Sequence, residues 1–151
     1  MEKGLDAYIR ERFALKEADL QEYSPLTLAY IGDGIFDLVI RSMVVAKGNT
    51  KPSALHRKTS SYVKAHAQCE MAQAIYPALT ETEQAYYRRG RNAKSQTMAK
   101  NASMSDYRKA TGFEALMGYL YLSNQTERLI DLIQLGLQSY TPPKGNSADK
   151  N

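Results

Sequence analysis

The feature that most constrains this fold is an apolar stretch at residues 24–41. It begins with Ser24 and Pro25, residue types that commonly cap and open a helix. Apolar residues then recur at helical spacing, and residues 47–49, Lys-Gly-Asn, are typical of a helix end. The stretch therefore predicts a long helix over residues 25–46.

Two acids interrupt this otherwise apolar helix. Asp33 and Asp37 fall one turn apart on a largely apolar face, where a carboxylate must be paired, protonated or bound to a metal. Arg41, four residues beyond Asp37, is a possible partner for it, whereas Asp33 has no such partner. Gly32 and Gly34 each cost about 1 kcal/mol relative to alanine, so we expect another element to approach this backbone closely. Asp33 is the first candidate functional residue.

Length and composition favour one intracellular domain. We expect a single domain over residues 1–140, with a peripheral N-terminal segment at 1–23 and a disordered polar tail at 141–151. Cys69 is the only cysteine, which excludes an internal disulfide and suits a reducing compartment. The polar start is unlike a secretory signal, and no apolar run is long enough to cross a membrane.

The remaining patterns are also helical. Helices are predicted from about residue 52 to 75, from 81 to about 90, over 106–122, and from 124 to about 139. Residues 91–97 lack apolar periodicity, and a loop is predicted from residue 91 to about residue 105. The expected fold class is all-α.

Positive charge is concentrated in two blocks. Residues 38–69 contain six Lys or Arg and no acid, and residues 88–109 contain seven against Asp106 alone. Solvated helix faces would explain such blocks, and so would binding to a polyanion such as nucleic acid.

Glu114 is the second candidate. It lies in an apolar helix with small residues beside it and no cation within reach on that helix. The carboxylate could be exposed, or paired with an arginine of another helix. Alternatively, its helix could pack against the helix of Asp33 and bring the two acids together. Magnesium takes oxygen ligands of this kind.

Both acids lie in motifs that resemble those of the ribonuclease III family. Residues 29–33, Ala-Tyr-Ile-Gly-Asp, are similar to its signature, and residues 113–118, Phe-Glu-Ala-Leu-Met-Gly, to its second acidic motif. The chain most resembles the Mini-ribonuclease III subfamily, a catalytic domain without an RNA-binding appendage. Further matches occur in order at residues 55–57, 67–68, 88–93, 100–101 and 107–108.

The resemblance implies a ribonuclease III-like helical bundle that forms a cytoplasmic homodimer and cleaves double-stranded RNA with Mg²⁺, or with Mn²⁺ in its place. Asp33 and Glu114 would be the catalytic metal ligands, and the products would carry 5′-phosphate and 3′-hydroxyl ends. Asp37 would add a ligand or, alternatively, pair with Arg41. The subfamily trims the stalk of precursor 23S ribosomal RNA, with a ribosomal protein as a possible helper.

Full-length ribonuclease III uses four acids at each site, and this chain matches two of them. Leu26 and Thr111 stand at the positions of the other two, as in the smaller subfamily.

RNA affinity would then come from the basic surface of the catalytic domain. The residues expected to contact RNA are Arg57, Arg88, Arg89, Arg91, Asn92, Lys94 and Lys100. Two other functions fit the same residues. One is a non-catalytic double-stranded RNA-binding module in ribosome assembly, and the other is a helical adaptor for an acidic protein.

Overall fold

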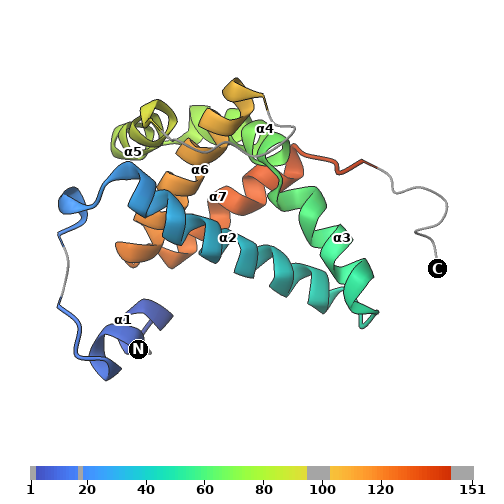
Figure 1. The fold of residues 1–151 in the computed structure, drawn as a ribbon, viewed down its shortest axis with the longest axis horizontal. Coiled ribbons are helices and arrows are strands. Elements are labelled where there is room, and N and C mark those ends of the chain that lie inside the picture. The colour runs from blue at the N-terminus through green and yellow to red at the C-terminus, as the bar shows by residue number, and fades with distance from the viewer. Residues whose placement is uncertain (1–2, 17–18, 95–102, 144–151) are drawn as a thin grey trace.

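A computed structural model describes residues 3–16, 19–94 and 103–143, and this part of the chain is all-α, as predicted (Figure 1). The α-helices are α1 (Leu5–Arg12), α2 (Pro25–Ala46), α3 (Pro52–Val63), α4 (Ala65–Ile75), α5 (Glu81–Asn92), α6 (Met104–Leu122) and α7 (Thr126–Gln138). Two short 3₁₀ helices, η1 (Leu20–Glu22) and η2 (Tyr76–Ala78), lie between them.

Helix α6 is the centre of the bundle. It packs against α2, α4, α5 and α7, and its apolar residues are buried on nearly every side. A helix that is apolar all round belongs in a core, which explains the composition of residues 110–120. Phe113 of α6 meets Phe36 of α2 edge to face, with ring centroids 5.1 Å apart.

Helix α2 has the predicted bounds, and the Ser24 hydroxyl caps it by accepting a hydrogen bond from the Thr27 amide at 3.1 Å. Its buried side is formed by Leu28, Ala29, Gly32, Phe36, Ile40 and Val44. The face that carries the acids is different from the one expected. Asp33 is exposed there, and the neighbouring Tyr30 is 82% exposed.

The predicted helix over residues 52–75 is wrong as a single element. Lys64 has an extended backbone, with φ −67° and ψ 157°, and separates α3 from α4. The Gln68 amide Nε2 donates to the Val63 carbonyl at 3.1 Å and satisfies one acceptor at the break. No proline or glycine marks this site, so nothing in the sequence indicated it.

Three other helix ends also differ from the predictions. Helix α5 continues through Gly90 to Asn92, and Gly90 lies against α6, where a Cβ would be 2.7 Å from the Cβ of Ala115. Helix α6 begins two residues early, at Met104, and Ser103 caps it. Asn124, expected to start the last helix, has φ +60° and lies in the turn before α7.

The two ends of the described chain differ in how they pack. None of the residues of α1 is buried, and α1 lies at the edge of the molecule in Figure 1. At the other end, Tyr140 is buried and its hydroxyl donates to the Ser61 carbonyl at 2.7 Å. Residues 144–151 of the predicted tail lie outside the described residues. None of the described helices has the length and hydropathy needed to cross a membrane.

Candidate active site

The candidate site lies where α2 crosses α6, and two glycines allow the close contact. A Cβ built on Gly32 would be 1.7 Å from the Glu114 carbonyl oxygen, and one on Gly118 would be 2.0 Å from the Leu28 carbonyl oxygen. The close approach predicted from the glycines is therefore confirmed at Gly32. It is wrong at Gly34, where nothing lies within 4 Å of the position a Cβ would take.

This crossing brings the two candidate acids together. The Glu114 carboxyl group is mostly buried and forms a hydrogen bond with the Asp33 carboxylate. Burial, this hydrogen bond and the negative charge of Asp33 raise the pKa of Glu114 to about 9. Near neutral pH, Glu114 therefore keeps its proton and donates it to Asp33. Among the described side chains, no cation forms an ion pair with Glu114.

Asp37 forms the alternative contact predicted for it. Its carboxylate accepts a hydrogen bond from Arg41 Nε at 2.6 Å, on the exposed surface of α2. The two positions that lack family acids are not ligands here. Thr111 is buried and donates its hydroxyl proton to the Tyr107 carbonyl at 2.9 Å, and Leu26 is an apolar side chain.

The donor set fits a hard divalent cation that keeps much of its water. Within the described part of the chain, no group of three or more His, Cys, Asp or Glu side chains is placed to hold a metal ion. Asp33 and Glu114 supply two carboxylates, and Mg²⁺ commonly uses one or two carboxylates with waters and substrate phosphates. A cation there would take the place of the Glu114 proton and relieve the repulsion between the acids.

Of the described residues predicted to contact RNA, all but Lys94 lie on helices. Arg88 and Arg89 are exposed near the end of α5. The Arg89 guanidinium lies 5.4 Å from the centroid of the Tyr86 ring, and the Tyr86 ring stacks on Tyr119 at 3.9 Å. Arg88 donates to the Tyr76 hydroxyl at 3.4 Å.

Arg91 and Asn92 form the last turn of α5, so the loop predicted to begin at residue 91 begins later. The Arg91 guanidinium lies 5.7 Å from the centroid of the Tyr87 ring. Lys94 is exposed just beyond α5, and Arg57 is exposed on α3. Lys100 lies outside the described residues.

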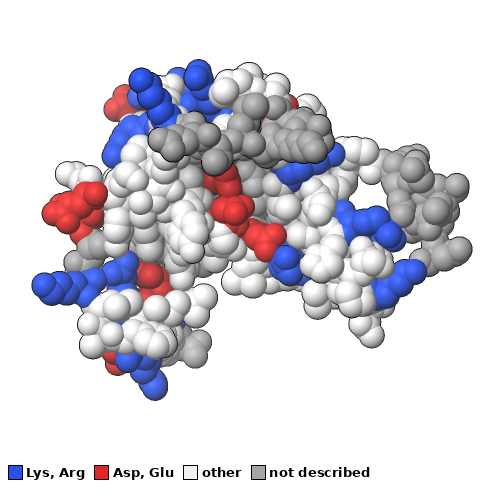
Figure 2. Space-filling model, viewed as in Figure 1, with Lys and Arg blue, Asp and Glu red and all other residues white. Residues whose placement is uncertain are grey.

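Over part of the displayed face, acidic and basic side chains gather in different places. Figure 2 shows acidic side chains gathered over the middle of the molecule beside α2, with basic side chains above them over α5 and to the right over α3. A polyanion on this face could contact both basic regions while one of its phosphates lay near the acids.

A histidine bridge was not predicted from the sequence. His66 of α4 contacts Asp106 of α6 through Nδ1 at 3.1 Å and Glu70 through Nε2 at 2.9 Å. Asp106 also interacts with Cys69, and burial followed by this contact raises the pKa of the Cys69 thiol to about 11. The spacing of His66 and Glu70 could have indicated their contact, whereas the partner on α6 depends on the tertiary fold.

An all-α bundle with a paired Asp and Glu where its two longest helices cross, beside arginine-bearing helices, agrees with the resemblance to the ribonuclease III family. The profile of the Ribonuclease III domain matches residues 26–125. The chain belongs to the ribonuclease III family, in its Mini-ribonuclease III branch. Its enzyme class, a double-strand-specific endoribonuclease, follows from that membership.

Known relatives match over most of their length. The chain is 52% identical to Mini-ribonuclease 3 of Enterococcus faecalis, over 76% of this chain and 89% of the relative. It is 44% identical to Mini-ribonuclease 3 of a Thermoanaerobacter species, over 91% and 97%. A crystal structure of a Fusobacterium nucleatum protein superposes with a TM-score of 0.72, at 29% identity, over 80% of this chain and 96% of that one.

Proposed function

We propose that this protein is a Mg²⁺-dependent endoribonuclease that cleaves double-stranded RNA, with Asp33 and Glu114 as its catalytic residues. The observation that carries the proposal is the hydrogen-bonded carboxyl pair where α2 crosses α6, in which Glu114 is mostly buried and Asp33 is exposed. Two acids held this closely repel each other when both are ionised. A fold that maintains such a pair gains most when a divalent cation is bound between them.

Asp33 and Glu114 would be the protein ligands of that cation. When bound, the metal lowers the pKa of a water nucleophile and stabilises the charge that develops on the phosphate. Glu114 must lose its proton to become a ligand, whereas Asp33 is exposed and accessible to the phosphate. Hydrolysis would leave 5′-phosphate and 3′-hydroxyl ends. Mn²⁺, which also takes carboxylate ligands, would support the reaction in place of Mg²⁺.

The basic surface would hold the RNA. Donors come from α3, from α5 and from the position just beyond α5, on Arg57, Arg88, Arg89, Arg91, Asn92 and Lys94. Lys100 completes the proposed set. Contacts of this kind position the backbone and read no sequence. Recognition would thus depend on the A-form shape, which suits the stalk of precursor 23S ribosomal RNA in the cytoplasm, with a ribosomal protein as helper.

We further propose that the enzyme is a homodimer. Apolar side chains are exposed along α2, at 38% for Leu26, 82% for Tyr30, 48% for Leu38 and 62% for Val45. Burial of such a stripe against a second copy would remove it from water. Sedimentation that shows only a monomer at the working concentration would contradict the dimer.

Cleavage of an end-labelled RNA duplex tests the enzyme. The reaction is run with Mg²⁺, with Mn²⁺ and with a chelator, using the wild type, Asp33→Asn and the matched control Asp131→Asn, an exposed residue of α7. We expect cutting that requires the metal and Asp33 and that is unchanged in Asp131→Asn. Binding of precursor ribosomal RNA without cutting would instead favour the non-catalytic RNA-binding module. A failure to bind RNA would favour the adaptor for an acidic protein.

A further inference from the structure

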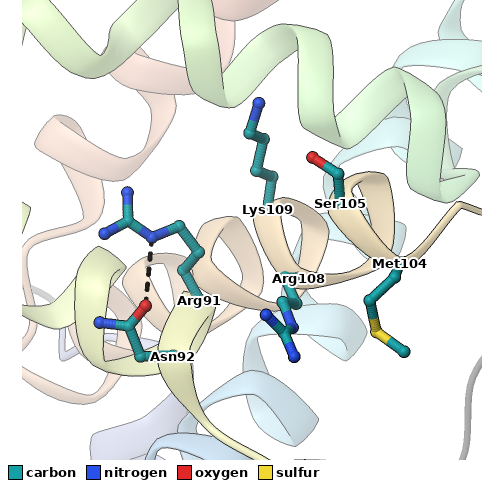
Figure 3. Close-up of a pocket in the computed structure, with 6 residues that line it drawn as sticks. All are labelled: Arg91, Asn92, Met104, Ser105, Arg108 and Lys109. Carbon is teal, nitrogen blue, oxygen red and sulfur yellow. Dashed lines mark hydrogen bonds between the residues drawn. The ribbon is translucent and has the colours of Figure 1, made fainter.

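A cationic cleft lies between α5 and α6, separate from the carboxylate pair. Its volume is about 360 Å³, and it is lined by Arg91, Asn92, Met104, Ser105, Arg108 and Lys109 (Figure 3). The first two residues end α5, and the other four come from the start of α6. Three of the six are cations and none is an acid, so the cleft suits an anionic ligand.

Of the cations of the cleft, Arg91 and Arg108 have no described acid as an ion-pair partner, whereas Lys109 is partly neutralised by Asp106. Asp106, the acid in the first turn of α6, is held by His66 and interacts with Cys69. Those contacts hold the carboxylate on the side of α4, where it also attracts Lys109. The lining of the cleft keeps a net positive charge, since it contains three cations and no acid.

The cations are spread along the cleft rather than aimed at one point. In Figure 3, Arg108 and Lys109 leave α6 in opposite directions, and Arg91 approaches from α5. The Tyr87 ring and Asn92, which accepts a hydrogen bond from Arg91 Nε at 3.4 Å, help to fix the Arg91 guanidinium. A compact anion could contact only part of this set, whereas a strand with successive phosphates could contact all of it.

The cleft is also within reach of an RNA bound at the candidate active site. Arg108 precedes Glu114 by six residues on the same helix, a rise of about 9 Å along the axis. One duplex could therefore occupy both places.

We propose that Ser105, Arg108 and Lys109 of α6, together with Arg91 and Asn92, bind consecutive backbone phosphates of the RNA duplex beside the cleavage site. This inference rests on the proposed endoribonuclease function and adds the start of α6 to the substrate-binding surface. The three α6 residues are positioning residues. They change where and how tightly the duplex lies, whereas the chemistry stays with the carboxylate pair.

The test separates binding from cleavage. Binding of a labelled RNA duplex is measured by fluorescence anisotropy in a chelator, over a series of KCl concentrations. The variant Arg108→Gln/Lys109→Gln is compared with Arg12→Gln/Lys16→Gln, which removes the same charge from exposed positions outside the cleft. The slope of log K against log salt should decrease by about 0.7 to 0.9 for each phosphate that the variant no longer binds. We therefore expect a decrease of about 1.5 and roughly tenfold weaker binding for the cleft variant alone.

Kinetics and a small-anion competitor complete the test. The cleft variant should show a higher KM and an unchanged kcat with Mg²⁺, because the carboxylate pair is intact. Replacing KCl with inorganic phosphate at equal ionic strength should displace no more RNA from the wild type than from the variant.

Each contrary result has a distinct meaning. If the wild type cleaves RNA but the cleft variant binds RNA with the wild-type affinity and salt slope, this inference is overturned and the enzyme proposal stands. If phosphate displaces more RNA from the wild type than from the variant, the cleft is a site for a small anion, and this result also overturns the inference. Wild type that binds RNA without cleaving would contradict the enzyme proposal, and the salt slopes would still test the cleft.

Discussion

Gly32 lies so close to Glu114 that no side chain fits between the two helices that carry them. A Cβ on Gly32 would be 1.7 Å from the Glu114 carbonyl oxygen, and that oxygen belongs to a backbone that cannot move independently of α6. The separation of the two helices, and with it the contact between Asp33 and Glu114, depends on this glycine.

Gly32→Ala should therefore destabilise the fold strongly. Separating α2 from α6 weakens packing along the whole crossing, and we expect a decrease of roughly 3 kcal/mol or more in the free energy of unfolding, comparable to severe overpacking. Gly34→Ala is the matched control, since it has the same chemistry in the same helix and an open position. That control should be neutral or stabilise by up to about 1 kcal/mol. Urea denaturation at one protein concentration measures both, and equal effects would contradict the close crossing.

Stability without metal should fall as pH rises through the neutral range. The pKa of Glu114 is about 9 in the folded state against 4.5 ordinarily. The folded state thus binds more protons than the unfolded state between these values, and the free energy of unfolding decreases by up to about 1.4 kcal/mol per pH unit from this group. Below about pH 4.5 and above about pH 9, this contribution becomes constant.

Glu114→Gln provides the comparison. The amide cannot ionise, so the variant should lose the pH dependence due to Glu114 and be more stable than the wild type at pH 8 in a chelator, while losing cleavage activity. Thermal unfolding between pH 5 and 9 at fixed ionic strength measures this. Parallel curves for the two proteins would show that Glu114 is ionised in the folded state.

Metal binding should release a proton. Since Glu114 is protonated near neutral pH, a cation that takes it as a ligand must displace about one proton per site. Isothermal titration of Mg²⁺ or Mn²⁺ at pH 7.5, in buffers with different ionisation enthalpies, measures the number released. A value near zero in the wild type would contradict the displacement of a proton from Glu114, and the release of one proton in Glu114→Gln would assign that proton to another group.

Arg89 should contribute a phosphate contact. Its guanidinium is exposed beside the Tyr86 ring, which limits its freedom while leaving donors accessible. Arg89→Gln should lower the salt slope of duplex binding by about 0.7 to 0.9, as expected for one phosphate. Arg12→Gln, with the same change of charge on α1, should leave the slope unaltered. An unchanged slope in Arg89→Gln would remove this residue from the RNA interface.

The sequence predicted the elements of the fold better than their ends. The cap at Ser24 and the apolar periodicity placed α2 correctly because both signals are local. The break at Lys64 and the continuation of α5 through Gly90 depend on packing between helices, which local patterns do not contain.

The same contrast between local signals and packing applies to the candidate site. Gly32 and Gly34 look alike in the sequence, and only the fold shows that one of them meets α6. From the sequence, contact between Asp33 and Glu114 was one of several possibilities, because it depends on how α2 and α6 pack. The contribution of Arg108 and Lys109 to a cleft with Arg91 could not be predicted, because it depends on how α5 and α6 meet.

A second carboxylate, Glu83, gives a prediction about stability alone. Its side chain is 5% exposed, and both oxygens accept hydrogen bonds from Arg128 at 2.9 Å. Glu83 also completes the capping box of α5 with Thr80, and the Arg128 contact lowers its pKa. Arg128→Ala should therefore lower the free energy of unfolding by about 3 kcal/mol, because it leaves the buried charge of Glu83 unpaired.

The pH dependence of stability shows whether Arg128→Ala acts by removing the Glu83–Arg128 ion pair or by disturbing the packing. A lowered pKa contributes stability that is present above about pH 4.5 and is lost as pH falls through the folded-state value. The difference between wild type and Arg128→Ala should therefore be largest near neutral pH and shrink in acid. Arg128→Lys, which keeps the charge without the bidentate geometry, should recover part of the stability. Urea denaturation at pH 7 and pH 3.5 measures these differences, and a difference that is the same at both values would assign the effect to packing rather than to the ion pair.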